Sequence, residues 1–306
     1  MALNNSKLRC LKNIIKTYRK VILAFSGGVD STFLLKICVD VLGEKNVIAV
    51  TAISDSYTKD ELEYARSISE NLKVKHILLE TNEMSDNDFV SNMSNRCYYC
   101  KKHLFSELKN IAKAQSIQYI FDASNVDDES DYRPGRIAAK DFFVRSPLIE
   151  AELTKEDIRK HSRALGLDSW NKPSSPCLAS RIPYGNKITK EKLEMVEKAE
   201  TFLKNEGFKI VRVRHHGEIA RIEVSEEDIQ KLMEKNTRRR TIEYFKNLGF
   251  VWITVDLKGY RTGSLNEILP EANINTSRIF SMGRSRGKKL KKPRRKQKGI
   301  KKVRDT

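Results

Sequence analysis

The stretch that most constrains this chain is an apolar run, Val21–Phe25, followed by two glycines and a second apolar segment. The run has the length of a buried strand, and the segment from Phe33 has the spacing of an amphipathic helix. Gly27 and Gly28 interrupt the pattern between them. The sequence therefore predicts a strand, a tight glycine turn and a helix N-terminus in immediate succession.

A turn of this kind is suited to an anion, because glycines let the backbone approach a ligand and the first helical amides are unpaired. The Gly-Lys-Ser/Thr ending of kinase and GTPase loops is missing. The run instead resembles the pyrophosphate loop, Ser-Gly-Gly-x-Asp-Ser, of enzymes that cleave ATP between its α- and β-phosphates. That resemblance implies that Ser26, Gly27, Gly28 and Ser31 hold pyrophosphate and that Asp30 helps to place Mg²⁺. The alternative is a glycine-rich turn without a ligand.

The pattern of strands and helices continues beyond this loop. Strands alternating with helices predict an α/β fold with a parallel sheet and helices on both faces. Further strands are expected at 46–52, 74–79, 119–122 and 142–149, and helices at 4–19, 58–71 and 101–114.

An acidic, turn-rich segment follows the strand expected at 119–122. Ligands of parallel sheets gather at the carboxyl ends of the strands. Ser124, Asn125 and Asp128 are therefore candidates for binding nucleotide or Mg²⁺, and an ordinary solvated loop is the alternative.

Four regions are predicted along the chain. Three of the seven prolines fall within residues 171–185, which is too rigid a composition for a floppy linker. A helix at 189–205, strands at 208–214, 218–224 and 250–256, and helices across 225–248 indicate a smaller α/β unit. The predicted boundaries are an ATP domain at 1–167, a Pro-rich linker at 168–186, a substrate domain at 187–283 and a disordered polybasic tail at 284–306.

The formal charge of +18 is unevenly placed. The tail holds thirteen of the 58 basic residues and one of the 40 acidic ones, so the rest of the chain is only mildly basic. Such a tail suits loose, salt-sensitive contact with RNA or another polyanion, or is a solvated tail without a partner. No apolar run approaches the roughly 20 residues of a membrane span, and the N-terminus lacks a signal-peptide core. A cytoplasmic protein is expected.

Five cysteines, an odd number, argue against a disulfide framework. Cys97, Cys100 and Cys177 fall at predicted loops or element edges beside basic or turn residues, so they need an explanation, although Cys97 and Cys100 packing near the site is an alternative. A Cys-x-x-Cys pair alone serves redox, zinc and iron–sulfur sites alike, and His103 is the one obvious fourth zinc ligand nearby. Two cysteines and a distant third also suit a 4Fe–4S cluster held by three thiolates.

Five separated motifs together are similar to the LarE family of ATP-dependent sulfur transferases. These are Ser26–Ser31, the Asn125/Asp128 loop, Asp131–Gly135, Pro176–Arg181 and Tyr260–Asn266. The resemblance implies a pyrophosphate-loop ATP domain. It also implies adenylation of a carboxylate of a pyridinium mononucleotide and sulfur transfer to it, a step towards the nickel-pincer cofactor.

By the same resemblance, Cys177 is the sulfur-bearing cysteine, and Arg181 beside it favours the thiolate and the developing carboxylate charge. The remaining positions are candidates for the substrate's phosphate and carboxylates or for proton transfer. They are Ser180, Glu200, Arg212, Arg214, Glu223 and Arg261. Plain surface ion pairs on exposed strands are the alternative for the arginines and glutamates.

Cys97 and Cys100 favour the cluster version of the family, in which an extra sulfide on the unique iron is the sulfur donor. In the alternative version Cys177 is sacrificial and ends as dehydroalanine. A tRNA thiolase and a non-catalytic iron–sulfur or sulfur carrier are the rival functions. The expected partners are a carboxylated mononucleotide, sulfide or a sulfur donor, and further copies of the chain in a dimer or ring.

Overall fold

The computed structural model describes residues 2–129, 134–173, 176–261 and 263–269. The polybasic tail at 284–306 and residues 131–133 of the predicted motif lie outside the described residues. Within them, no helix is long and apolar enough to cross a membrane.

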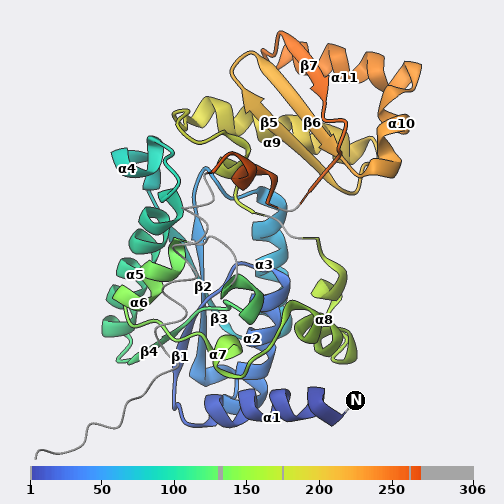
Figure 1. Ribbon diagram of the computed structural model, residues 1–306. Helices are drawn as coiled ribbons and strands as arrows, with labels where there is room; N and C mark the ends of the chain where they lie inside the picture. The colour runs from blue at the N-terminus through green and yellow to red at the C-terminus, as the bar shows by residue number, and fades with distance from the viewer. Residues whose placement is uncertain (1, 130–133, 174–175, 262, 270–306) are drawn as a thin grey trace, which may run out of the picture.

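A four-stranded parallel sheet forms the centre of the larger part (Figure 1). The apolar run before the glycine turn is its strand β1 (Val21–Ala24), which lies between β2 and β4. The other strands are β2 (Val47–Ile53), β3 (Lys75–Glu80) and β4 (Tyr119–Phe121), in the order β3-β2-β1-β4. The predicted α/β fold with a parallel sheet is confirmed.

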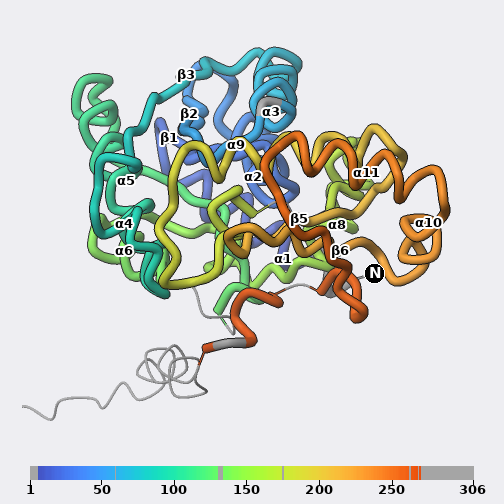
Figure 2. Tube along the Cα trace, turned by 90° about the horizontal axis from the view of Figure 1, so that it is seen from above, coloured from blue at the N-terminus to red at the C-terminus, as the bar shows by residue number. Residues whose placement is uncertain are grey.

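Helices cover both faces of this sheet because both faces are apolar. Val21 and Leu23 point into one core and Ile22 into the other. Figure 2 shows α5 and α6 together on the second face. On the first face lie α1 (Ala2–Lys16), α2 (Val29–Leu42), α3 (Lys59–Asn71) and α8 (Lys155–Ala164); on the second lie α5 (Arg96–Ala114) and α6 (Gly135–Asp141).

Two elements differ from the sequence prediction. No strand forms over 142–149; Arg145 makes a single bridge to Phe121, and a short helix, α7 (Pro147–Glu150), follows. Pro147 starts this helix, since proline lacks the N–H that would extend a ladder and suits a first helical turn. Helix α5 begins five residues earlier than predicted, so Cys97 lies at the edge of the helix, in its first turn, and Cys100 lies within it. The buried side chain of Arg96 anchors this first turn, which propensity alone would not reveal.

A second, three-stranded sheet lies in the C-terminal part (Figure 1). β5 and β6 are antiparallel and joined at Gly217, while β6 and β7 are parallel. Phe208, Phe245 and Phe250 lie in its core. Its elements are α9 (Lys190–Asn205), β5 (Val211–His216), β6 (Ile219–Val224), α10 (Ile229–Met233), α11 (Lys235–Asn247) and β7 (Trp252–Val255).

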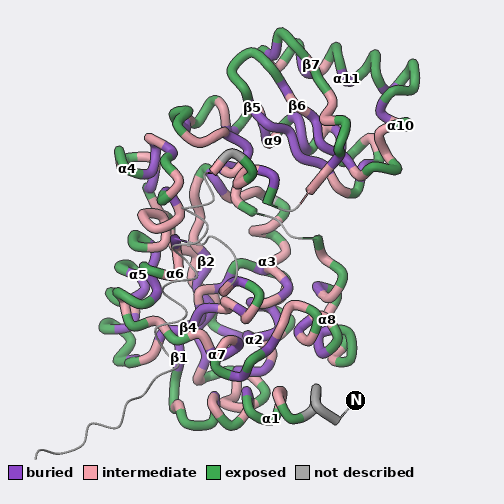
Figure 3. Tube along the Cα trace, viewed as in Figure 1, coloured by how far each residue is buried: buried purple, intermediate pink, exposed green. Residues whose placement is uncertain are grey.

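A separate apolar cluster joins the two parts. It combines Phe89 and Val90 of α4 (Asn87–Val90) with residues of the 3₁₀ turn η5 (Leu178–Arg181) and of α9. Residues 176–182, which we call the Cys177 loop, are therefore packed between the two halves of the chain. Figure 3 shows buried segments running through both sheets and continuing into this junction.

Candidate active site

The phosphate loop, residues 26–31, connects β1 to α2 at the carboxyl edge of the parallel sheet. Gly27 has φ +65°, a left-handed conformation that favours glycine. A Cβ at this position would lie 3.3 Å from the Cβ of Ala65 on α3. Both the backbone angle and the close approach of α3 therefore call for glycine here.

The N-terminus of α2 opens towards this loop. Within the described residues, no side chain caps its amides. The hydroxyl oxygens of Ser26 and Ser31 lie 3.1 Å apart, and the Ser31 hydroxyl donates to the Gly28 carbonyl over 3.2 Å. Helix amides and hydroxyls at one point are the groups that bind phosphate in proteins. The geometry is thus compatible with the predicted anion cradle.

Two lysines that sequence reasoning did not select also reach this loop. Lys155 Nζ lies 2.6 Å from Asp30 Oδ2, the carboxylate predicted to help place Mg²⁺. Lys172 Nζ lies 3.4 Å from the Gly27 carbonyl oxygen, and burial lowers the pKa of this lysine. Neither lysine belongs to the Ser-Gly-Gly-x-Asp-Ser pattern, so only tertiary contacts identify them.

The predicted polar residues after β4 shape their own loop. The Ser124 hydroxyl donates to Asp122 Oδ2 over 2.9 Å. Asn125 Oδ1 accepts from the Asp127 amide over 2.9 Å, and Asp128 Oδ2 accepts from the Asn125 amide over 3.0 Å. The loop lies at the carboxyl end of β4, as expected, and its binding role stays a prediction.

Cys177 directly precedes the 3₁₀ turn η5. The Cys177 loop lies close to the residues that follow the end of β2. The Leu178 amide donates to the Ser56 carbonyl over 3.0 Å, and the next residue, Tyr57, donates its hydroxyl to the Ser26 carbonyl over 2.7 Å. Ser56 and Tyr57 therefore bond to the Cys177 loop and to the phosphate loop, respectively. The two loops are neighbours at one edge of the sheet.

The three predicted cysteines come close enough for their charges to interact. Burial raises the pKa of the Cys177 thiol, and the Arg96 guanidinium opposes this, followed by Arg181. Burial also raises the pKa of Cys100 to about 12, with Glu83 and Cys177 adding to the effect. Among the described residues, however, no three His, Cys, Asp or Glu side chains are arranged to hold a metal ion.

His103, considered above as a fourth zinc ligand, is used elsewhere. Its Nε2 lies 2.6 Å from Asp86 Oδ2 at a partly exposed position.

Arg96 is a functional candidate that sequence reasoning missed. Its side chain is only 2% exposed, and Nη1 donates to the Ala179 carbonyl over 2.9 Å and to Asn92 Oδ1. Asn92 Nδ2 in turn donates to the carbonyls of Ile182 and Pro183, over 3.1 and 2.8 Å. These two side chains hold the Cys177 loop against the start of α5. A basic residue next to Cys97 was the one available signal.

Arg181 is paired with a buried carboxylate. Its Nε and Nη2 donate to the two oxygens of Glu200 over 2.8 and 2.9 Å. Its Nη1 donates to the carbonyls of Pro176 and Cys177, over 2.5 and 3.2 Å. Despite its burial, Glu200 has a lowered pKa because Arg181 stabilises the carboxylate. Arg181 thus holds the backbone on either side of the cysteine.

A second buried pair connects the C-terminal sheet to the same loop. Arg214 donates from Nε and Nη2 to Glu223 over 2.9 and 2.8 Å, and from Nη1 to the Ser180 carbonyl over 2.9 Å. Glu223 is 0% exposed. Arg212 is also buried, with its guanidinium 5.2 Å from the centre of the Tyr260 ring. The Arg214–Glu223 pair and Arg212 are therefore buried, unlike the plain surface ion pairs that the alternative interpretation expects.

Arg261 differs from the other predicted substrate residues. Its Nε pairs with the exposed Glu267 over 3.0 Å, and its Nη1 lies 3.4 Å from Asp256. It is the most exposed of the predicted arginines, at the rim of the network and not within it.

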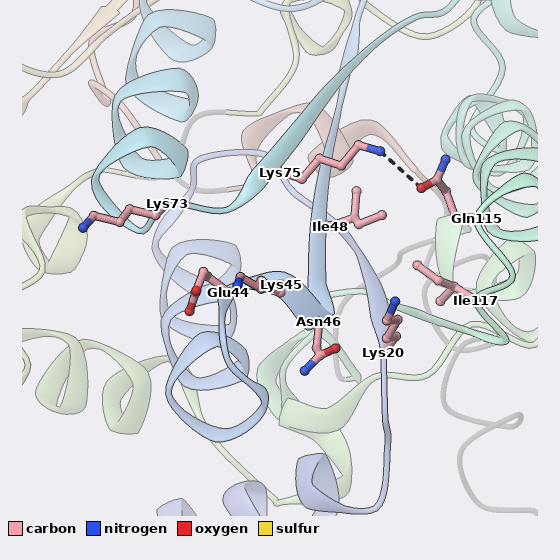
Figure 4. A pocket seen from close by; sticks show the side chains of 9 residues that line it. All are labelled: Lys20, Glu44, Lys45, Asn46, Ile48, Lys73, Lys75, Gln115 and Ile117. Carbon is pink, nitrogen blue, oxygen red and sulfur yellow. Dashed lines mark hydrogen bonds between the residues drawn. The ribbon is translucent and has the colours of Figure 1, made fainter.

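A lysine-rich hollow lies at the opposite edge of the sheet (Figure 4). Lys20 and Asn46 immediately precede β1 and β2, and Lys75 of β3 donates to Gln115 Oε1 over 3.2 Å. None of the predicted site residues lines it. The predicted chemistry therefore concentrates at the carboxyl edge.

Comparisons with known proteins agree with this geometry. A family model described as NAD synthase matches residues 5–114, which include the phosphate loop. An NH(3)-dependent NAD(+) synthetase of Fusobacterium nucleatum is 33% identical over 69 residues, which is 22% of this chain and 27% of that protein. Together with the parallel sheet, these matches define the class as the pyrophosphate-loop ATP-cleaving enzymes.

Longer matches define the family. A pyridinium-3,5-bisthiocarboxylic acid mononucleotide synthase of Lactiplantibacillus plantarum is 38% identical over 276 residues, covering 90% of this chain and 99% of that protein. An uncharacterized protein of Synechocystis is 43% identical over 264 residues, covering 86% and 98%. The chain belongs to the LarE family and is an ATP-dependent sulfur transferase.

Proposed function

We propose that this enzyme converts carboxylates of a pyridinium-3,5-biscarboxylic acid mononucleotide into thiocarboxylates, a step of nickel-pincer cofactor synthesis. The 38% identity to the Lactiplantibacillus plantarum synthase over nearly its whole length supports this substrate. The structural observation that carries the proposal is the pairing of Ser56 and Tyr57 with the Cys177 loop and the phosphate loop. That pairing brings a cysteine next to the site proposed for ATP cleavage.

The reaction divides into adenylation and sulfur transfer. A substrate carboxylate oxygen attacks the α-phosphorus of ATP, the bond to the β-phosphate bridging oxygen breaks, and pyrophosphate leaves. Ser26, Gly27, Gly28 and Ser31 bind the phosphates, and Asp30 helps to place Mg²⁺, whose preferred ligands are oxygens. A sulfur nucleophile then attacks the acyl carbon, and AMP departs with the electron pair of the broken C–O bond.

The buried arginines give the substrate a cationic environment. Arg181, Arg212 and Arg214 bring three positive charges against the two negative charges of Glu200 and Glu223. These side chains are buried, and electrostatic attraction between an arginine and a phosphate or carboxylate is strong in a region shielded from water. Ser180 and Arg261 flank this network, at the Cys177 loop and at the rim.

For the sulfur donor, we propose a 4Fe–4S cluster on Cys97, Cys100 and Cys177. The donor set suits it, since three thiols lie in one partly buried region, although the thiols are not in ligand positions in this structure. Such a cluster would supply an extra sulfide on its unique iron. Arg96, within the same region, would balance the negative charge of the thiolates.

A second candidate for the same step needs no metal, and no three His, Cys, Asp or Glu side chains among the described residues are arranged to hold a metal ion. In that version the Cys177 thiolate attacks the acyl-adenylate and forms a thioester. A base then removes the Cα proton of Cys177 and its electron pair forms the Cα=Cβ bond, while the Cβ–S bond breaks, which releases the thiocarboxylate and leaves dehydroalanine in the chain.

Iron and acid-labile sulfide per chain test the two versions after anaerobic reconstitution of wild type, Cys97→Ala and Cys177→Ala. About four irons in wild type, lost in both variants, support the cluster. No iron in any of them excludes it, and a mass loss at Cys177 equal to one H₂S after turnover then identifies the sacrificial route. Wild type that forms neither pyrophosphate nor a thiolated mononucleotide contradicts the proposed function.

A further inference from the structure

Lys172 is a charged residue at the phosphate loop that the motif does not contain. Its Nζ lies 3.4 Å from the Gly27 carbonyl and 4.0 Å from the centre of the Tyr64 ring, on α3. Its side chain is partly buried, and desolvation lowers the pKa of the ammonium group. The ammonium group is thus partly removed from water, and within the described residues it donates one long hydrogen bond.

The part of the chain that the structure describes has no carboxylate paired with Lys172. Among the described residues, no Asp or Glu oxygen lies within 4.0 Å of its Nζ, and Asp60 and Glu61 act only at longer range. Lys155, the other lysine of this region, is paired with Asp30 over 2.6 Å. A buried charge is costly unless it is paired. An anion in the phosphate loop would supply the missing partner.

The position of Lys172 is also built from several sides. Arg159 of α8 donates from Nη2 to the Lys172 carbonyl over 2.8 Å and from Nη1 to the Trp170 carbonyl over 2.6 Å. The Lys172 amide donates to the Ser169 carbonyl over 2.9 Å. Both the amide and the carbonyl of Lys172 are therefore hydrogen-bonded, while the Tyr64 ring supports the side chain by a cation–π contact. Preorganisation of this kind reduces the entropy lost on binding.

We infer that Lys172 binds the phosphate groups of the nucleotide at the phosphate loop, with Arg159 and Tyr64 as its positioning residues. The inference rests on the proposed function and extends it to a residue outside the motif. The N-terminal amides of α2 and the Lys172 ammonium group then contact the same anion from two elements. The ligand chemistry is that of a polyphosphate, either ATP or the pyrophosphate it releases.

The test is equilibrium binding to the full chain, measured by calorimetry with Mg²⁺, using inorganic pyrophosphate, ATP and adenosine as probes. Lys172→Met removes the charge at similar length, and Lys172→Arg keeps it. Lys187→Met, at an exposed lysine of the neighbouring segment, is the matched control.

Lys172→Met should weaken pyrophosphate and ATP binding roughly tenfold to a hundredfold, because hydrogen bonds to charged groups are worth about 1.5–3 kcal/mol. Adenosine affinity should stay unchanged, Lys172→Arg should recover most of the loss, and Lys187→Met should match wild type. Wild-type pyrophosphate affinity in Lys172→Met overturns the inference alone, as does an equal loss for adenosine. Wild type that binds neither ATP nor pyrophosphate overturns the inference and the proposed function together.

Discussion

The phosphate loop and the Cys177 loop lie at the same edge of the sheet, yet they are built in opposite ways. The phosphate loop is shaped by its own residues, chiefly Gly27 at φ +65° and the helix that follows it. The Cys177 loop is shaped by side chains distant in sequence. Arg96 donates to the Ala179 carbonyl across 83 positions, and Arg214 donates to the Ser180 carbonyl across 34.

This difference suggests a division of labour between the loops. A loop made of local backbone can be carried between proteins as a motif, and the NAD synthase family model indeed matches residues 5–114, which include this loop. A loop held by distant side chains depends on the rest of its own fold. Adenylation should therefore survive changes to the Cys177 loop, whereas sulfur transfer should not survive changes to its supports.

The sharpest test of this division is Cys177→Ala. Sulfur transfer should fall by about 10³-fold or more, as is typical when a reacting group is removed, while pyrophosphate release continues. Thiolated product and pyrophosphate are measured in the same reaction, with Cys10→Ala as the exposed-cysteine control. Equal loss of both products would show that the two loops do not act separately.

Glu200→Ala should have the next largest effect, on stability. It leaves Arg181 buried at 2% exposure without its carboxylate, and breaking a buried pair in this way costs about 3–5 kcal/mol. Urea unfolding measures the free energy. Glu267→Ala, which breaks the exposed pair with Arg261, should change stability little. Similar losses in both variants would contradict the importance of burial in this network.

Arg96→Met tests the support of the Cys177 loop from α5. Losing a buried charged donor should cost about 1–3 kcal/mol and reduce sulfur transfer about tenfold more than pyrophosphate release. Rates of the two half-reactions and urea unfolding are the measurements. Arg96→Lys keeps the charge but not the planar fork, and should recover part of the transfer rate. A parallel fall in both half-reactions would assign Arg96 to general stability alone.

Gly27→Ala tests the phosphate loop itself and should cost less stability than Glu200→Ala. The left-handed angle should cost about 1–2 kcal/mol, and the new Cβ meets Ala65. Gly43→Ala is the matched control, because Gly43 has φ +83° with open space around it. Both variants should lose stability, measured by thermal unfolding, but only Gly27→Ala should lose ATP affinity. Weakened ATP binding in Gly43→Ala would contradict the conclusion that the phosphate loop is shaped by its own residues.

Much of the fold follows from the sequence because its signals are local. The apolar runs of β1 and β2 bury both faces, so they predict a parallel sheet directly. Two elements differ from the prediction, one because of a distant contact and one because of a proline within the segment itself. The start of α5 at Arg96 depends on bonds to Asn92 and Ala179, and the segment at 142–149 stops after one bridge at Arg145 because Pro147 begins a helix.

The sequence alone determined which chemical groups this protein has: the phosphate loop, the three cysteines and the basic residues beyond them. The tertiary structure decided which groups meet. It turned Arg181 to Glu200, brought Arg96 to the Cys177 loop and placed Lys172 at Gly27. The physical reason is the separation along the chain over which each kind of interaction acts. Backbone conformation is set by neighbours in sequence, whereas buried charges take their partners from whatever elements the packed core brings together.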